Sequence, residues 1–159
     1  MNIEPFVMPA LEPGCRADLA AAIEAMPASR LIGLQVLGFA ASGVSAIALP
    51  VRAALSFDGR VVQGGIVGML ADYAGVSAAA CTLPVGWMAS TTGYEVHNLA
   101  PAAGVRLVAL GRALHVGRGH AVSRAEVWAF ADEKDSKKAT LVAWATTTCR
   151  PFELRPITV

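Results

Sequence analysis

Charged residues are scarce in this chain, and neither sign dominates. Asp, Glu, Lys and Arg make up 16% of its 159 residues, and 13 basic against 12 acidic side chains leave a formal net charge of +1. Because a nucleic-acid surface usually needs a stripe of Lys and Arg with interleaved aromatic residues, which is missing here, we expect no nucleic-acid partner. Hydrophobic residues reach 55%. That composition predicts a folded chain whose surface is partly covered by further copies, a homo-oligomer.

Cysteine and histidine are also few, with three of each. The cysteines are odd in number and widely spaced, which fits neither a disulfide framework nor a zinc site. The histidines lack ligand spacing and read as solvated or core side chains. We therefore expect no metal and a reducing, cytoplasmic setting. The residues concerned are Cys15, Cys81, Cys149, His97, His115 and His120.

Two kinds of hydrophobic segment are missing as well. The N-terminus has no basic region followed by an apolar one, since acidic residues and prolines interrupt it, so we expect no secretion signal. Residues 61–81 are apolar and long enough to raise the question of a membrane span. The glycines, Gln63 and Asp72 within them argue against one.

The length predicts one domain over residues 1–159. Residues 1–29 form an N-terminal extension with one short helix over 15–26, where Leu19, Ile23 and Met26 recur at helical spacing and Pro27 ends the pattern. Two strand-like runs, 31–38 and 44–51, read as a hairpin.

A long helix is predicted from Gly64 or Gly65 to Cys81, closed by Pro84 and Gly86. Four strand-like runs follow, with a charged turn over 132–138 before the last, and they read as an antiparallel meander. The order of elements predicts an α+β domain with an antiparallel sheet packed on one main helix. The four runs are 88–98, 106–116, 121–131 and 140–150.

Asp72 is the most informative residue, because it lies in an otherwise apolar helix. Burying a carboxylate costs several kcal/mol unless it is paired or used, so either a structural hydrogen bond or a function must account for it. Gly64 and Gly65, at the start of the same helix, leave the first backbone N–H groups open to an oxyanion or a polarised carbonyl, or simply permit tight packing.

Three segments resemble the hotdog-fold acyl-CoA thioesterases, in particular the phenylacetic-acid-degradation (PaaI-like) branch, over roughly residues 30–150. Residues 59–72, GRVVQGGIVGMLAD, are similar to the family's loop, His-Gly-Gly and helix, with an acidic residue nine positions after the His position. Residues 91–102, TTGYEVHNLAPA, resemble a strand ending in an Asn-Leu-x-Pro-Ala corner. Residues 111–118 and 125–128 resemble the paired strands that follow.

The resemblance implies a hotdog fold, an antiparallel sheet wrapped around a long central helix, in a dimer whose sheets join edge to edge. Many members pair further into dimers of dimers. It also implies that the N–H of Gly64 polarises the thioester carbonyl, while Asp72 of the opposite subunit acts as nucleophile or general base. Thr91, ten positions before Pro101, matches a Ser or Thr that orients the acid or the water. An ordinary strand hydroxyl is an equal interpretation of Thr91.

The chain departs from the family pattern at Gln63, where the best-known members have His. Gln can donate and accept hydrogen bonds but cannot titrate. If this position only holds the carbonyl or the loop, Gln is adequate, whereas a role in proton transfer would leave activity low. We expect an orienting role.

Five further residues are candidates for binding the substrate. Met69 and Tyr73, with neighbouring Leu70, either line an acyl pocket or belong to the core. Arg118, on a Gly-Arg-Gly turn, either meets a coenzyme A phosphate or is an exposed turn residue. The five are Gly65, Met69, Tyr73, Asn98 and Arg118.

The sequence thus predicts an enzyme, a thioester hydrolase that converts acyl-CoA to free acid and coenzyme A. Coenzyme A is part of the small-molecule substrate, and we expect no other cofactor. A noncatalytic hotdog protein that binds acyl-CoA or a fatty acyl ligand is the alternative suggested by Gln63. A hotdog hydratase would need an Asp and His pair that we do not find. A purely structural subunit is disfavoured, because the apolar helix would gain stability if Asp72 were absent.

Overall fold

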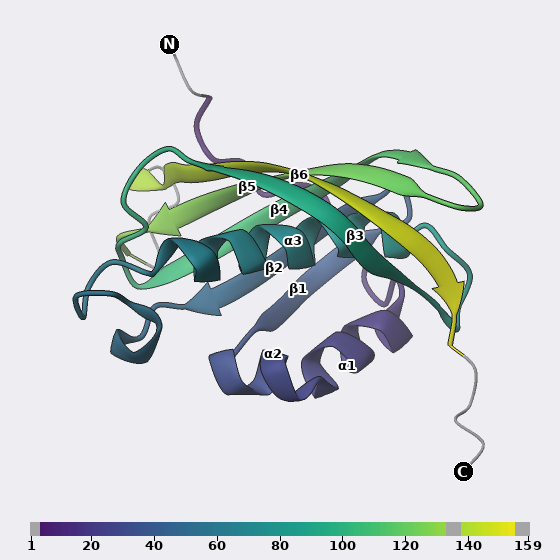
Figure 1. The fold of residues 1–159 in the computed structure, drawn as a ribbon, viewed down its shortest axis with the longest axis horizontal. Helices are drawn as coiled ribbons and strands as arrows, with labels where there is room; N and C mark the ends of the chain where they lie inside the picture. The colour runs from purple at the N-terminus through teal and green to yellow at the C-terminus, as the bar shows by residue number, and fades with distance from the viewer. Residues whose placement is uncertain (1–3, 133–137, 155–159) are drawn as a thin grey trace.

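The structure is a computed structural model that describes residues 4–132 and 138–154 (Figure 1). Its elements run in the order α1 (Ala17–Ala25), α2 (Pro27–Ile32), β1 (Gln35–Ala40), β2 (Val44–Pro50), a 3-10 turn (Ala53–Leu55), α3 (Gly64–Ala80), β3 (Trp87–Asn98), β4 (Arg106–Val116), β5 (Ala121–Phe130) and β6 (Thr140–Glu153). Among the described residues no helix is both long and apolar enough to cross a membrane.

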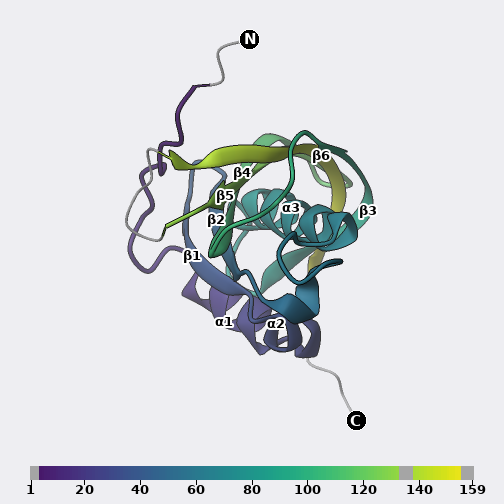
Figure 2. The same ribbon diagram turned by 90° about the vertical axis from the view of Figure 1, so that its left-hand side faces the viewer.

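One antiparallel sheet wraps around α3. It has six strands in the order β1-β2-β4-β5-β6-β3, and every pairing is antiparallel. Seen along the helix, the sheet curves over α3 from one side to the other, while α1 and α2 lie below (Figure 2). The predicted α+β architecture, an antiparallel sheet around a long central helix, is confirmed.

The predicted meander of four consecutive strands is wrong in its first member. Strands β4, β5 and β6 are neighbours in chain order, but β3 pairs with β6 and β4 pairs with β2. Local patterns show where strands occur, whereas pairing depends on tertiary contacts. Here β3 covers the flank of α3, where a Cβ on Gly68 would lie 3.2 Å from Val96. The chain therefore crosses the sheet between β3 and β4.

The N-terminal segment also differs from the prediction. Pro27 ends the first helix but occupies the first turn of a second one, where its fixed φ and missing N–H are tolerated. Gly33, at φ 76, ends that helix, so β1 starts at Gln35 rather than at Leu31. Residues 133–137 of the predicted charged turn lie outside the described residues.

Small residues let α3 lie unusually close to the sheet. Gly111 of β4 faces α3 where a Cβ would overlap the Ala74 carbonyl, and the Ser45 hydroxyl donates a 2.6 Å hydrogen bond to that same carbonyl. At the next residue, a Cβ on Gly75 would lie 2.6 Å from Thr147 Oγ1. Interiors packed this tightly transmit small changes in volume, so the position of α3 is closely fixed.

Candidate active site

Asp72 lies on α3 and is only partly exposed. Its Oδ2 accepts a 2.8 Å hydrogen bond from the Thr91 hydroxyl on β3. Its Oδ1 is buried and has no hydrogen-bond partner among the described residues. Burial raises the pKa of this carboxyl above its ordinary 3.8, and the Thr91 hydrogen bond offsets part of that rise. A buried acceptor without a partner costs free energy, so this oxygen is the strongest sign of a site that binds something.

Thr91 contacts Asp72, and whether its hydroxyl orients the acid or is an ordinary strand hydroxyl stays a prediction. Thr91 lies opposite Cys149 in the β3–β6 ladder, immediately before an irregularity that shifts the register by Gly93. Burial, and then the charge of Asp72, raises the pKa of the Cys149 thiol to about 11. The thiol next to the site is therefore protonated at neutral pH and is a poor nucleophile.

The start of α3 presents a free backbone donor. Gln63 is the N-cap, and its Oε1 accepts a 2.7 Å hydrogen bond from the N–H of Gly65. The Gly64 N–H donates to no described residue. Since the first N–H groups of a helix point along the positive end of its dipole, Gly64 offers an unsatisfied donor suited to a carbonyl oxygen.

Both glycines have polar side-chain ends close to the place of a Cβ. A Cβ on Gly64 would lie 3.3 Å from Nδ2 of Asn98, at the end of β3. A Cβ on Gly65 would lie 2.8 Å from the Gln63 oxygen that caps the helix. The structure thus brings four sequence candidates together at this end of α3, namely Gln63, Gly64, Gly65 and Asn98.

Within one chain, the two halves of the predicted catalytic pair do not meet. Gly64 and Asp72 are eight positions apart on α3, which corresponds to about 12 Å along the helix axis. A single carbonyl group cannot contact both. Any site that uses the two groups together must combine the Gly64 of one subunit with the Asp72 of another.

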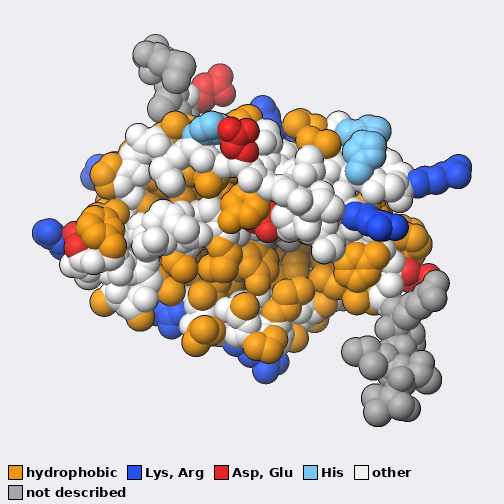
Figure 3. Space-filling model, viewed as in Figure 1, with side chains coloured by type: hydrophobic (Ala, Val, Ile, Leu, Met, Phe, Trp, Pro, Cys, Tyr) orange, Lys and Arg blue, Asp and Glu red, His pale blue; other side chains and the backbone are white. Residues whose placement is uncertain are grey.

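A pocket of about 390 Å³ opens beside Asp72, between α1, α3 and the start of β3. Hydrophobic side chains gather on this face of the molecule, over the region between β3 and α1 (Figure 3). Met69 and Tyr73 line the pocket as predicted, whereas Leu70 is fully buried in the core. The complete lining is Leu19, Ile23, Met26, Met69, Asp72, Tyr73, Val76, Ser77, Ala80, Met88, Ala89, Ser90 and Thr91.

No family model and no curated protein matches the chain. Several solved structures, in contrast, are similar to the chain. A thioesterase family protein from Silicibacter pomeroyi is 21% identical, with TM-score 0.77, over 88% of this chain and 99% of the other. The Haemophilus influenzae thioesterase is 18% identical, with TM-score 0.72, over 89% and 92%. The Escherichia coli PaaI protein from the phenylacetic acid degradation operon is 19% identical, with TM-score 0.72, over 90% and 96%.

The chain has the hotdog fold. The fold expectation that followed from residues 59–72 and 91–102 is thereby confirmed, and the matched structures cover 88% and 89% of the chain. These identities are too low to carry catalytic residues from one hotdog protein to another, so the roles of Asp72 and Gly64 rest on the geometry of this chain.

Arg118 lies apart from the pocket in this hotdog fold. It is exposed on the turn between β4 and β5 and lines a separate shallow groove with Trp87 and Arg150. Ser90 borders both the groove and the apolar pocket. The structure therefore leaves a contact between Arg118 and coenzyme A as a prediction.

One part of the site, contributed by the N-terminal helix, was not predicted from the sequence. Leu19, Ile23 and Met26 of this segment line the pocket opposite α3. Their signal was visible, since their spacing predicted an apolar helical stripe, but nothing in the sequence showed what the stripe faces. Among the described residues there is no cluster of three or more His, Cys, Asp or Glu that could hold a metal ion.

Proposed function

We propose that this protein is a PaaI-like acyl-CoA thioesterase that hydrolyses acyl-CoA to free acid and coenzyme A. The observation that carries the proposal is Asp72, a carboxylate with one oxygen held by Thr91 and the other buried without a partner at the wall of an apolar pocket. An apolar cavity that presents one carboxylate suits a substrate with a hydrophobic acyl group and a reactive carbonyl.

In the proposed reaction, the thioester carbonyl accepts a hydrogen bond from the Gly64 N–H, whose place at the helix start favours the negative charge that develops on that oxygen. Asp72 of the other subunit removes a proton from water, and the resulting hydroxide adds to the carbonyl carbon. The C–S bond then breaks, and protonated Asp72 gives its proton to the leaving thiolate, which releases the carboxylic acid and coenzyme A and restores the carboxylate. Direct attack by Asp72, giving a mixed anhydride that water hydrolyses, is the second route.

The raised pKa of Asp72 supports the general-base route. A carboxyl whose pKa lies above its ordinary value binds protons more strongly, and so it accepts a proton from water more readily than an exposed Asp does. Thr91 orients the carboxylate by fixing one of its two oxygens.

The proposal requires at least a dimer, because Gly64 and Asp72 of one chain are too far apart to share a carbonyl. Strand β3 supports this requirement, since it lies at the edge of the sheet, spans 12 residues and is mostly exposed. A long unpaired edge strand is a ready partner for a second copy. We infer that two β3 strands pair, which brings the α3 helices of the two subunits to a common seam.

The deciding experiment follows the release of free thiol from a panel of acyl-CoA substrates. Wild type is compared with Asp72→Asn and Asp72→Ala, and with Asp58→Asn, an exposed turn carboxylate, as the control. The proposal predicts a loss of roughly 100-fold or more for both Asp72 variants and no change for the control. Equal turnover in all four proteins would remove Asp72 from the mechanism.

A noncatalytic acyl-CoA or fatty acyl binding protein is the second candidate. The capping role of Gln63 favours it, because the oxygen bound to the Gly65 N–H leaves only a neutral amide where a titrating side chain would be expected. Tight binding of acyl-CoA, with no thiol release above the uncatalysed rate, would select this candidate.

A further inference from the structure

The pocket follows one face of α3 away from Asp72. The helix contributes lining residues at a repeating spacing of three and four positions, which places them on a single stripe. The stripe starts at Met69, passes Asp72 and continues to Ala80 at the last turn of the helix. The carboxylate therefore lies near one end of the pocket, and most of the stripe lies beyond it.

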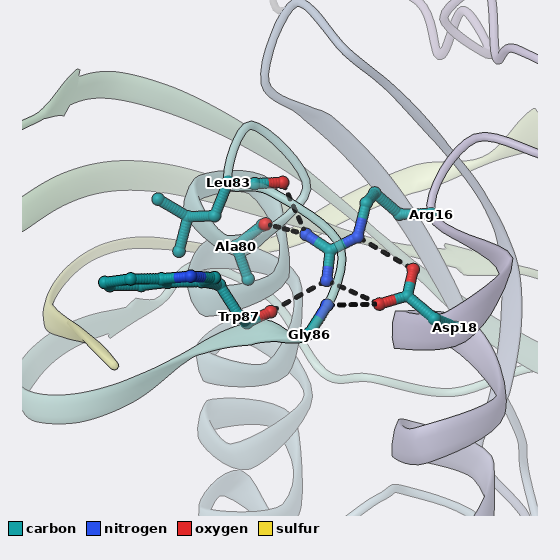
Figure 4. Close-up of polar contacts among 6 residues, drawn as sticks. All are labelled: Arg16, Asp18, Ala80, Leu83, Gly86 and Trp87. Atoms are coloured by element: carbon teal, nitrogen blue, oxygen red, sulfur yellow. Dashed lines mark hydrogen bonds and ion pairs between the residues drawn. The ribbon is translucent and has the colours of Figure 1, made fainter. Parts of the chain in front are cut away.

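The far end of the pocket is fixed by Arg16, which precedes α1. Its guanidinium donates to the carbonyls of Ala80, the last residue of α3, at 2.6 Å, of Leu83, in the turn after the helix, at 2.8 Å, and of Trp87, at the start of β3, at 2.7 Å (Figure 4). Asp18 completes this cluster. Both of its carboxylate oxygens accept hydrogen bonds from the guanidinium, and one also accepts a 3.3 Å hydrogen bond from the Gly86 N–H. The first turn of α1 is thus tied to the last turn of α3.

The other end of the same wall is held near Asp72. The fully buried Ser29 of α2 donates a 3.2 Å hydrogen bond to the hydroxyl of Tyr73, the neighbour of Asp72. Since Arg16 is tied to Ala80 and Ser29 to Tyr73, the α1–α2 segment runs antiparallel to α3, as Figure 1 also shows. Leu19 consequently lies toward the far end of the pocket and Met26 toward the carboxylate.

The length of the pocket follows from the separation of Asp72 and Ala80 along α3. Asp72 and Ala80 are eight positions apart, or about 12 Å along the helix. An extended polypeptide rises at most about 3.6 Å per residue over three backbone bonds, or roughly 1.2 Å per bond. An extended acyl chain therefore needs about ten bonds to span this distance. The volume of about 390 Å³ agrees, because groups the size of a water molecule occupy about 30 Å³ each and roughly a dozen would fill it.

The lining also defines the chemistry of what fits. Among the described residues that form it, Asp72 is the only charged side chain, and the part beyond Asp72 is mainly aliphatic and thioether side chains. A charged or strongly polar acyl group would lose its hydration there without gaining partners.

We propose that the acyl chain of the substrate lies in this pocket, with its carbonyl at Asp72 and its terminal methyl group at Leu19, Ala80 and Met88. The substrate is then a medium-chain acyl-CoA of about eight to ten carbons, and the N-terminal helix α1 sets the upper limit of chain length. This inference rests on the proposed function for the fate of the thioester, but not for the shape of the pocket.

Two kinds of variant change the pocket in opposite directions. Val76→Phe places a ring in the middle of the pocket, and it should lower kcat/KM for decanoyl-CoA roughly tenfold or more while butyryl-CoA stays within about twofold. Leu19→Ala and the less buried Met88→Ala open the far end, and each should move the preferred substrate about two carbons longer. Leu31→Ala removes an aliphatic side chain that is 78% exposed on the same segment, outside the pocket, and is the control.

The measurement is kcat/KM for acyl-CoAs from two to sixteen carbons and for phenylacetyl-CoA, with calorimetric binding of the free acids in parallel. If wild type hydrolyses no thioester but binds decanoate more tightly than butyrate, and Val76→Phe removes that difference, the pocket inference stands and the proposed function fails. If hydrolysis occurs with a preference for acetyl-CoA or phenylacetyl-CoA, the inference is overturned while the function stands. A uniform loss across all lengths in natively folded Val76→Phe also overturns it.

Discussion

The Thr91 hydroxyl donates a 2.8 Å hydrogen bond to Oδ2 of Asp72, across the contact between β3 and α3. This bond joins the edge strand, where a second subunit can pair, to the buried carboxylate. The other oxygen of Asp72 is left without a partner among the described residues. The site therefore holds its acid by one oxygen and leaves the other buried without a partner.

Removing this hydrogen bond should lower the activity and should also change its dependence on pH. The bond lowers the pKa of Asp72 against the larger effect of burial, so Thr91→Val should raise that pKa further. In the proposed mechanism the active form is the carboxylate, so the acidic limb of the kcat/KM profile should move to higher pH, and the plateau should fall roughly tenfold. Thr91→Ser keeps the hydroxyl and should retain the wild-type profile. An unmoved limb in Thr91→Val would show that Thr91 does not tune Asp72.

Asp72→Asn should stabilise the protein at neutral pH. Because burial raises the folded-state pKa of Asp72, the ionised form costs stability, and this cost appears as the pH rises from the ordinary value of 3.8 through the folded-state value. Below 3.8 both states are protonated and the cost is absent. The gain in free energy of unfolding, measured by urea titration, should be present at pH 7 and should shrink toward pH 3. A gain that does not depend on pH would contradict this account.

The Arg16 cluster should contribute to stability through its hydrogen bonds. Arg16→Met leaves three carbonyls of the α3–β3 connection without their donor and should lower the free energy of unfolding by roughly 2–4 kcal/mol. Arg60→Met, whose side chain is 86% exposed, should change it by less than about 0.5 kcal/mol. Equal stability of the two variants would mean that the cluster is not stabilising.

Asp18 gives the same cluster a signature at acidic pH. The hydrogen bond from Arg16 lowers the pKa of Asp18 from 3.8 to about 2. A depressed carboxyl pKa contributes stability that is complete above 3.8 and is lost as the pH falls through about 2. Asp18→Asn should therefore be less stable than wild type at pH 6, and the two unfolding curves should converge near pH 2. Curves that stay apart at pH 2 would point to packing rather than charge.

Gly111 should tolerate no side chain. Gly111→Ala would drive its Cβ into the Ala74 carbonyl of α3, which is backbone and cannot rotate away, so we expect a loss of roughly 1–3 kcal/mol or more in thermal or urea unfolding. Gly119→Ala is the matched control, because nothing lies within 4 Å of the corresponding Cβ. A native-like Gly111→Ala would show that α3 can move away from β4.

Sequence patterns predicted those features that depend on local spacing. The helix from Gly64, the four later strands and the unusual Asp72 all follow from periodicity and from the cost of a buried charge. The role of Gln63 as N-cap is likewise a local property, although it was not anticipated. Fold recognition from residues 59–72 held because the glycines and Asp72 keep a fixed separation on one helix.

Features that depend on which elements contact each other in the folded chain could not be predicted from local sequence patterns. No local signal shows that β3 joins β6 rather than β4, since either pairing satisfies the same alternation. Arg16 gave no signal either. It adopts a left-handed conformation, φ 47 and ψ 47, that non-glycine residues seldom take, and three carbonyls distant in sequence compensate for the strain.

The N-terminal helix α1 and Met26, which follows it, precede the segment that resembles the family, yet they form one side of the pocket. A shortened chain that starts at residue 30 would keep Gln63, Gly64, Asp72 and Thr91 and would still contain every strand of the sheet. It would lose Leu19, Ile23 and Met26, leaving the aliphatic stripe of α3 open to water on that side. Under the proposed function, homologues that differ before residue 30 would share the reaction while differing in the acids they release, so the N-terminal segment could change selectivity without altering Asp72 or Gly64.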